Sequence, residues 1–151
     1  MGKRLDACLH ESAHSVVRQL LIGDLKETGY KKRASYSYPV ERRPLVEIGR
    51  EKLGKIAVFL EAGIIAERRL CSDLGNESVK EYAISDDVRQ LKEIQRIAEF
   101  SGEQMEAFER EAAELVEAHE TAIRKTATEL NRRGELSGEQ VLRLMEKYPP
   151  H

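Results

Sequence analysis

The five residues His10-Glu11-Ser12-Ala13-His14 constrain the local fold strongly, because the apolar residues around them recur at helical spacing. These apolar positions are Leu9, Ala13, Val16, Val17, Leu20 and Leu21. A spacing of three and four residues is typical of an amphipathic helix. Asp6 is suited to cap the start of this helix, and Gly23 is suited to end it. We therefore predict a first helix of about four turns that carries both histidines.

Two histidines four residues apart lie on the same face of a helix, one turn from each other. His10 and His14 could therefore offer imidazole nitrogens to one metal ion. Glu11 would then lie beside the open position of the metal, where a carboxylate can take a proton from water. This is the pattern of zinc hydrolases, in which zinc lowers the pKa of a bound water to about 7. The alternative interpretation is an accidental spacing of ordinary helix residues.

A catalytic zinc also needs a third protein ligand. Asp86 and Asp87 follow Ser85 at the predicted start of a helix and are candidates. The alternative is structural, because acidic residues are favoured in the first turn of any helix. Cys8 lies close to His10 in the sequence, but a small core residue is the simpler interpretation of this thiol.

The remaining pattern predicts a mainly helical chain with a small β element. Residues 24–50 carry alternating side chains, and we expect one or two short strands there, with Pro39 favouring an outer strand. Tyr36 and Tyr38 would face one way and Ser37 the other. Further helices are expected at 51–71, 86–100, 103–132 and 138–148, with a loop at 72–85 and a frayed tail after Tyr148. Ser101 and Ser137 each begin a Ser-Gly-Glu-Gln capping box.

Length and composition fit one domain, residues 1–151. The formal net charge of −2 gives no argument for a nucleic-acid surface. No apolar run approaches the roughly 18 residues that span a membrane, and the N-terminus lacks a signal-peptide pattern. Two cysteines do not form a disulfide scaffold, so we expect a cytoplasmic protein with no membrane and no nucleic-acid partner.

Four segments in order resemble the peptidase domain of the FtsH-type ATP-dependent zinc metalloproteases. "LHESAHSVV" resembles the family's "HEAGHAVV", and "FLEAGIIAERRL" resembles the helix containing "GGRAAEEL". "ISDDVRQLKEI" resembles the "SNDLxxAT" segment, whose aspartate is a zinc ligand in that family. The stretch from Arg110 to Met145 resembles its C-terminal helices. The resemblance implies a zincin-like helical metallopeptidase domain, with a metal-site half (1–100) and a C-terminal helical part (101–148).

The resemblance carries site residues across by position. His10 and His14 match the histidine ligands of Zn²⁺, Glu11 matches the catalytic base, and Asp87 matches the aspartate ligand. Glu67 matches a helix glutamate that can accept a hydrogen bond from a ligand histidine and fix its tautomer. The alternative for Glu67 is a solvated carboxylate next to two arginines.

The chain also departs from the family. Ala13 replaces a glycine, Tyr82-Ala83-Ile84 replaces Thr-Gly-Ala, and residues 24–50 are barely recognisable. The sequence shows no ATPase glycine loop and no membrane-spanning segment. We therefore expect a metallopeptidase for peptides or unfolded polypeptide segments, with a separate ATPase or adaptor as a possible partner. The alternatives are a non-catalytic metal-binding or regulatory module with the same fold, and a helical interaction protein with an accidental motif.

Overall fold

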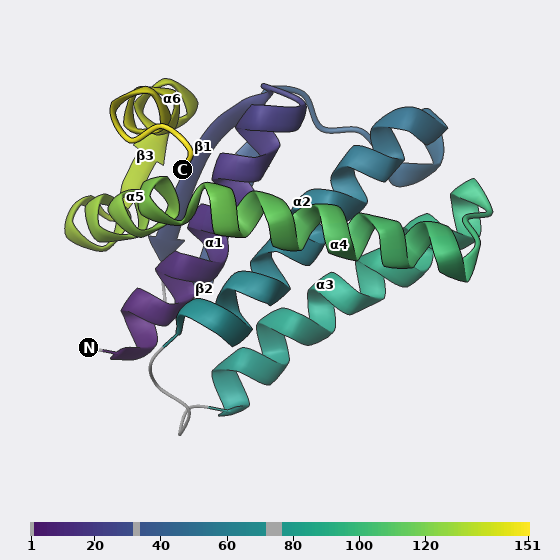
Figure 1. Cartoon of the computed structure of the whole chain (residues 1–151), viewed down its shortest axis with the longest axis horizontal. Helices are drawn as coiled ribbons and strands as arrows, with labels where there is room; N and C mark the ends of the chain where they lie inside the picture. The colour runs from purple at the N-terminus through teal and green to yellow at the C-terminus, as the bar shows by residue number, and fades with distance from the viewer. Residues whose placement is uncertain (1, 32–33, 72–76) are drawn as a thin grey trace.

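The computed structural model describes residues 2–31, 34–71 and 77–151. In these ranges the chain is mainly helical, with a small three-stranded antiparallel sheet (Figure 1). This confirms the predicted fold class. The elements in chain order are α1 (Gly2–Leu21), β1 (Leu25–Lys31), β2 (Ala34–Pro39), the 3-10 turn η1 (Leu45–Glu47), α2 (Arg50–Leu70), α3 (Glu77–Ala98), α4 (Gly102–Ala118), α5 (Glu120–Arg133), β3 (Glu135–Ser137) and α6 (Gly138–Lys147).

Helix α1 begins earlier than predicted and ends where predicted. It starts at Gly2, so Asp6 lies inside the helix and is buried, and the expectation that Asp6 caps the helix is wrong. Gly23 has a φ of +77° and donates its backbone N–H to the Arg18 carbonyl at 2.9 Å. Glycine adopts this left-handed conformation without steric strain, which ends the helix.

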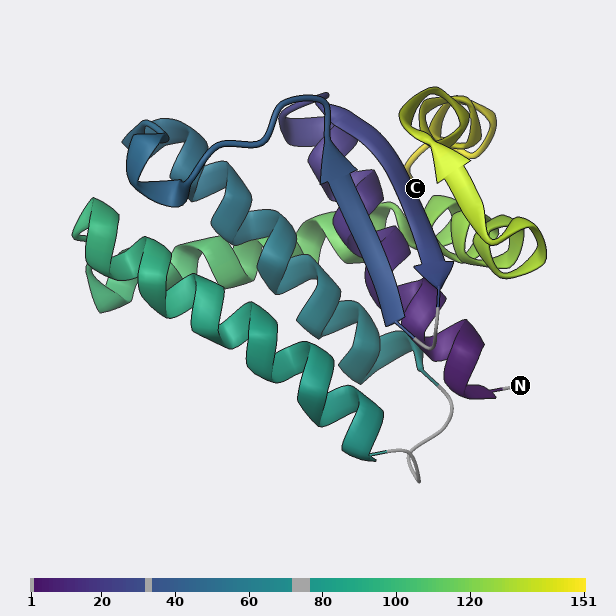
Figure 2. The ribbon, with the colours of Figure 1, turned by 180° about the vertical axis from the view of Figure 1, so that it is seen from behind.

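The same helix forms the centre of the molecule. Every residue from Cys8 to Val17 is buried, including the polar ones. Strands β1 and β2 run alongside α1 on one side, as Figure 2 shows, and α2 and α5 pack against α1 as well. An amphipathic helix was predicted, and the sheet covers part of its polar side. A buried polar side chain is costly without a partner, and His10, His14 and Glu11 find theirs inside the protein.

The sheet has the strand order β2-β1-β3, so Pro39 lies in an outer strand as predicted. Thr28 of β1 pairs with Ser37 of β2 and with Leu136 of β3, both antiparallel. The rings of Tyr36 and Tyr38 lie 4.9 Å apart on one face, which confirms the predicted alternation of β2. Strand β3 was not predicted, because three residues are too few to show a period of two.

The prediction of a loop at residues 72–85 is wrong from Glu77 onward, because these residues are part of helix α3. The helix already begins at Glu77, while residues 72–76 lie outside the described residues. Residues 77–85 contain neither Gly nor Pro, so nothing in them stops a helix. Asp86 and Asp87 therefore lie well inside α3. The interpretation that they stabilise the first turn of a helix is wrong.

The helix predicted at 103–132 is two helices. Its path breaks at His119, whose φ of −105° and ψ of 18° are not helical. The backbone N–H of His151 donates to the Ala118 carbonyl at 3.0 Å, so the tail docks at this break instead of fraying. Both predicted capping boxes are confirmed at Ser101 and Ser137.

Candidate metal centre

Helices α1 and α3 bring three potential metal ligands together. The Nε2 atom of His10 lies 2.8 Å from Oδ2 of Asp87, and Nε2 of His14 lies 3.0 Å from the same oxygen. The two Nε2 atoms are 3.0 Å apart. All three side chains are buried, and together they form a group that could hold a metal ion.

The ring of His14 is held by a backbone carbonyl and lies in the space left by a glycine. Its Nδ1 lies 2.6 Å from the carbonyl oxygen of Phe59 in α2. A carbonyl only accepts hydrogen bonds, so Nδ1 carries the proton and Nε2 keeps its lone pair in the neutral ring. A Cβ at Gly63 would lie 2.2 Å from Cε1 and 2.4 Å from Nε2 of the same ring. Gly63 therefore provides the space in which the imidazole lies.

The ring of His10 is fixed by a carboxylate of the same helix α2. Its Nδ1 lies 2.9 Å from Oε2 of Glu67, and both side chains are 4% exposed. Donation from Nδ1 to this oxygen leaves Nε2 of a neutral His10 as an acceptor. A hydrogen bond of this type orients a ligand histidine and raises its basicity. Glu67 is therefore buried beside His10 and is not a solvated helix carboxylate.

These hydrogen bonds make the centre attractive for a cation. With both rings neutral, two nitrogen lone pairs and a carboxylate oxygen would converge within 3.0 Å of one another. Such an arrangement is repulsive unless positive charge lies among the three atoms. The donor set of two imidazoles and one carboxylate is one that zinc binds.

The attraction between the two histidines and Asp87 also shifts the pKa values of all three groups. Burial lowers the pKa of His10, but the hydrogen bonds that its ring donates to Asp87 and Glu67 outweigh this effect and raise the pKa to about 10. The pKa of His14 is raised as well, because the attraction of Asp87 overcomes the burial of the ring. Burial would raise the pKa of Asp87, yet the two histidines lower it. The three groups together thus favour a buried positive charge next to the carboxylate.

The spacing of the donor atoms also fits a metal ion. Zinc at about 2.0–2.1 Å from each ligand in a tetrahedral site places neighbouring ligand atoms about 3.3 Å apart. The observed separations of 2.8, 3.0 and 3.0 Å are shorter by a few tenths of an ångström. Small rotations of the side chains would therefore be enough to fit the ion.

Glu11 lies next to His10 on α1 and is held by the sheet. The hydroxyl of Ser37 in β2 donates to Oε1 of Glu11. The hydroxyls of Ser15 and Thr28 lie 3.1 and 3.2 Å from that of Ser37. Glu11 is 7% exposed. Its carboxylate is thus positioned by a small group of hydroxyls behind it and is not among the three convergent donor atoms.

Two other candidates considered in the sequence lie outside this group. Asp86 is exposed and accepts hydrogen bonds from Arg89 at 2.7 Å and Gln90 at 3.0 Å. Cys8 is fully buried, and burial raises the pKa of its thiol to about 11. Cys8 therefore has the character of a core residue, as the simpler interpretation proposed.

A pocket of about 530 Å³ lies close to the centre. It is lined by Phe59, whose ring makes an edge contact with His14 at 5.9 Å between centroids, and by Gln90 of α3. Val40 and Leu45, from the segment that follows β2, supply apolar lining. Such a pocket can accept a side chain of a bound molecule.

Sequence reasoning missed three contributors to this site. The carbonyl of Phe59 carries no sequence signal at all, because every residue has a carbonyl. Gly63 lies on the buried face of α2, and nothing in the sequence marks it as the space for His14. Ser37 was correctly predicted to face away from Tyr36 and Tyr38, and that alternation was the available signal for its contact with Glu11.

No family model matches this sequence, and a search of curated proteins finds no match. None of the helices among the described residues is long and apolar enough to cross a membrane.

Proposed function

We propose that the protein is a zinc-dependent metallopeptidase that hydrolyses peptides or unfolded polypeptide segments. The observation that carries this proposal is the convergence of His10, His14 and Asp87, with Glu11 adjacent on the same helix. A purely structural metal site has no need of a carboxylate at that position. The four segments that resemble FtsH-type peptidases support the same conclusion.

In this mechanism the side chains of the chain have separate roles. His10, His14 and Asp87 would hold Zn²⁺, which when bound polarises a carbonyl group and makes water more acidic. Glu11 takes the proton of the attacking water and later delivers it to the leaving amine. Ser37 keeps the Glu11 carboxylate in place by donating a hydrogen bond to it. Glu67 accepts a hydrogen bond from Nδ1 of His10 and so orients the ring with Nε2 toward Asp87.

The surroundings support a peptide substrate. Strand β2 lies at the edge of the sheet and carries Ser37, so an extended peptide could pair with its backbone beside Glu11. The pocket lined by Phe59 and Gln90 would take a neighbouring side chain. A separate ATPase or adaptor would supply folded proteins in unfolded form. Both cysteines are free and buried, which supports a reducing compartment such as the cytoplasm.

The test is the cleavage of unstructured substrates by wild type and by Glu11→Gln at equal zinc occupancy. The amide cannot accept the proton, so we expect hydrolysis to fall by about 10²–10⁴, the usual contribution of acid–base catalysis. Zinc content and melting temperature should stay unchanged, because Glu11 is not a ligand in this proposal. Equal rates for the two proteins would identify a contaminating protease and remove the support for catalysis.

A second candidate function is a non-catalytic metal-binding or regulatory module. The observation that favours it is the burial of the three ligand side chains, which are only 4–8% exposed. A catalytic zinc keeps one position open to substrate. Absence of cleavage by fully zinc-loaded wild type, across a broad peptide library, would favour this module over the peptidase.

A further inference from the structure

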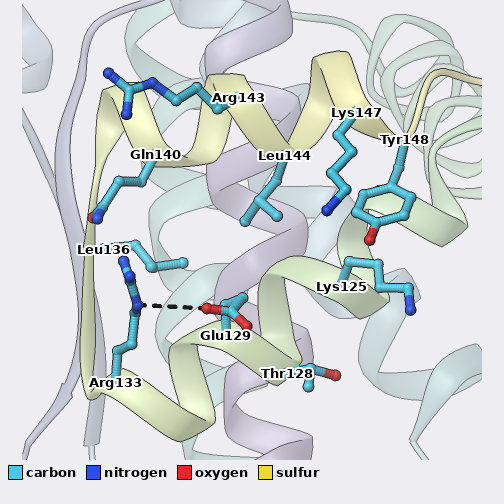
Figure 3. A pocket seen from close by; sticks show the side chains of 10 residues that line it. All are labelled: Lys125, Thr128, Glu129, Arg133, Leu136, Gln140, Arg143, Leu144, Lys147 and Tyr148. Carbon is cyan, nitrogen blue, oxygen red and sulfur yellow. Dashed lines mark ion pairs between the residues drawn. The ribbon is translucent and has the colours of Figure 1, made fainter.

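A second pocket lies between α5, β3 and α6, among elements that supply none of the three convergent ligands. Its volume is about 490 Å³, within the range of pockets that bind ligands. Figure 3 shows Lys125, Lys147 and Tyr148 at one end of it and Arg133 and Gln140 at the other. We call this pocket the basic groove.

Four of the ten side chains that line the basic groove are cationic, and one is anionic. Lys125, Arg133, Arg143 and Lys147 line it, against the single carboxylate of Glu129. That carboxylate is already bound by Arg132 at 2.7 Å and by Arg133 at 3.4 Å. The whole chain has a formal net charge of −2, so this concentration of positive charge is local. A local field of this kind attracts acidic molecules.

Apolar surface lies between the two charged ends. Leu144 of α6 points into the space between the ends (Figure 3), whereas Leu136 of β3 also lines the groove but is only 2% exposed. The ring of Tyr148 is covered by Lys125 and Lys147, whose Nζ atoms lie 5.4 and 5.5 Å from its centroid. An occupant that matches the whole groove must therefore carry an apolar group between negative charges.

We propose that the basic groove is a docking surface for an acidic polypeptide segment with one apolar anchor residue. Asp or Glu side chains would face the cations at the two ends, and the anchor would lie against Leu144. A nucleic-acid backbone is a poorer match, because its phosphates would leave the apolar centre without a partner. This inference does not depend on the proposed peptidase activity.

The experiment uses fluorescein-labelled peptides rich in Asp and Glu with a central Leu, Phe or Met, measured by anisotropy against the full chain. In a neutral version of each peptide, Asn and Gln replace the acids. The charge-reversal variant is Lys125→Glu/Lys147→Glu. The matched control is Lys55→Glu/Lys92→Glu, which changes the net charge equally at exposed positions outside the groove lining. Melting temperature and zinc content verify that both variants are folded.

We expect the acidic peptides to bind, and the neutral versions to bind at least about tenfold more weakly. The groove variant should lose at least about tenfold in affinity, while the matched control stays within about twofold. Leu144→Ala should weaken binding further at high salt, where the apolar contact dominates.

Three results would overturn the proposal. One is that no acidic peptide of the set binds. Another is an equal loss in the groove variant and the matched control, which would mean attraction to the whole chain. The third is tighter binding of a single-stranded oligonucleotide or of anionic vesicles than of the acidic peptides, which would assign the groove to another class of partner.

Discussion

The candidate metal centre and the basic groove both gather ionisable side chains, but they do so under opposite conditions. In the candidate metal centre, the ring Nε2 atoms of His10 and His14 and Oδ2 of Asp87 are buried and lie 2.8–3.0 Å apart. In the basic groove, Lys125 and Lys147 are exposed and rest against the ring of Tyr148. A buried charge needs specific partners, so burial imposes geometry. An exposed charge keeps its solvent and acts mainly through long-range attraction.

The network around α1 shows how strictly burial imposes that geometry. Each ring of the two histidines uses one nitrogen for a fixed partner on α2 and points the other at Asp87. The helix therefore buries polar residues without leaving these rings unpaired. The exposed lysines of the groove have no comparable requirement, and substitutions of Lys125 and Lys147 should act on binding and not on the fold.

The largest effect on zinc affinity is expected at Asp87. Asp87→Ala removes the acceptor shared by both histidines, and zinc affinity should fall by more than about 100-fold, beyond the loss typical of an outer partner. Competition with a chromophoric chelator measures this change. The neighbouring Asp86→Ala is the control and should keep its affinity, because Asp86 is exposed and bound to Arg89. A loss in Asp86→Ala with full affinity in Asp87→Ala would contradict the centre described here.

A smaller effect is expected at Glu67, which accepts a hydrogen bond from His10 and is not one of the three proposed ligands. Glu67→Gln keeps the shape of the side chain but weakens the hydrogen bond that orients His10, so zinc affinity should fall by about 10–100-fold. The same chelator competition applies, with the exposed Glu51→Gln of the same helix as control. Unchanged affinity in Glu67→Gln would show that the carboxylate does not tune the centre.

The smallest effect is expected at Glu61 of α2, a partly buried acid that changes the stability of the protein with pH. Burial, and then the nearby carboxylate of Glu109, raise its pKa from 4.5 to about 7. Glu61 thus binds its proton more tightly in the folded protein than in the unfolded chain. Its contribution to stability is complete below pH 4.5 and is lost as the pH rises to about 7.

We therefore expect Glu61→Gln to stabilise the protein at pH 8 by about 1 kcal/mol, a value reduced for the solvent exposure of the group. At pH 5 the gain should be small. Urea denaturation at both pH values, with Glu51→Gln as reference, measures the difference. The same gain at both pH values would show that charge at Glu61 is not the cause.

The histidine pair of the candidate site could be predicted from the local sequence pattern. The spacing of His10 and His14 needs only a helix, and the apolar residues around them predicted one. Asp87 and Glu67 came from the resemblance of their segments to a family, since neither position has a distinctive local pattern. The contact of Ser37 with Glu11 depends on how the sheet lies over α1, which no local period encodes.

The helical periods, the capping boxes at Ser101 and Ser137 and the glycine that ends α1 follow from the local sequence. These features depend on neighbours within a few residues. The burial of α1 on its polar side, the break between helices at His119 and the addition of β3 to the sheet follow from tertiary packing instead. Each of these depends on contacts between residues far apart in the chain, such as the pairing of Thr28 with Leu136 and the hydrogen bond from His151 to Ala118. The candidate metal centre depends on both local sequence and tertiary packing. The helix sets the spacing of His10 and His14, and the packing of α3 against α2 brings the carboxylate of Asp87 to them.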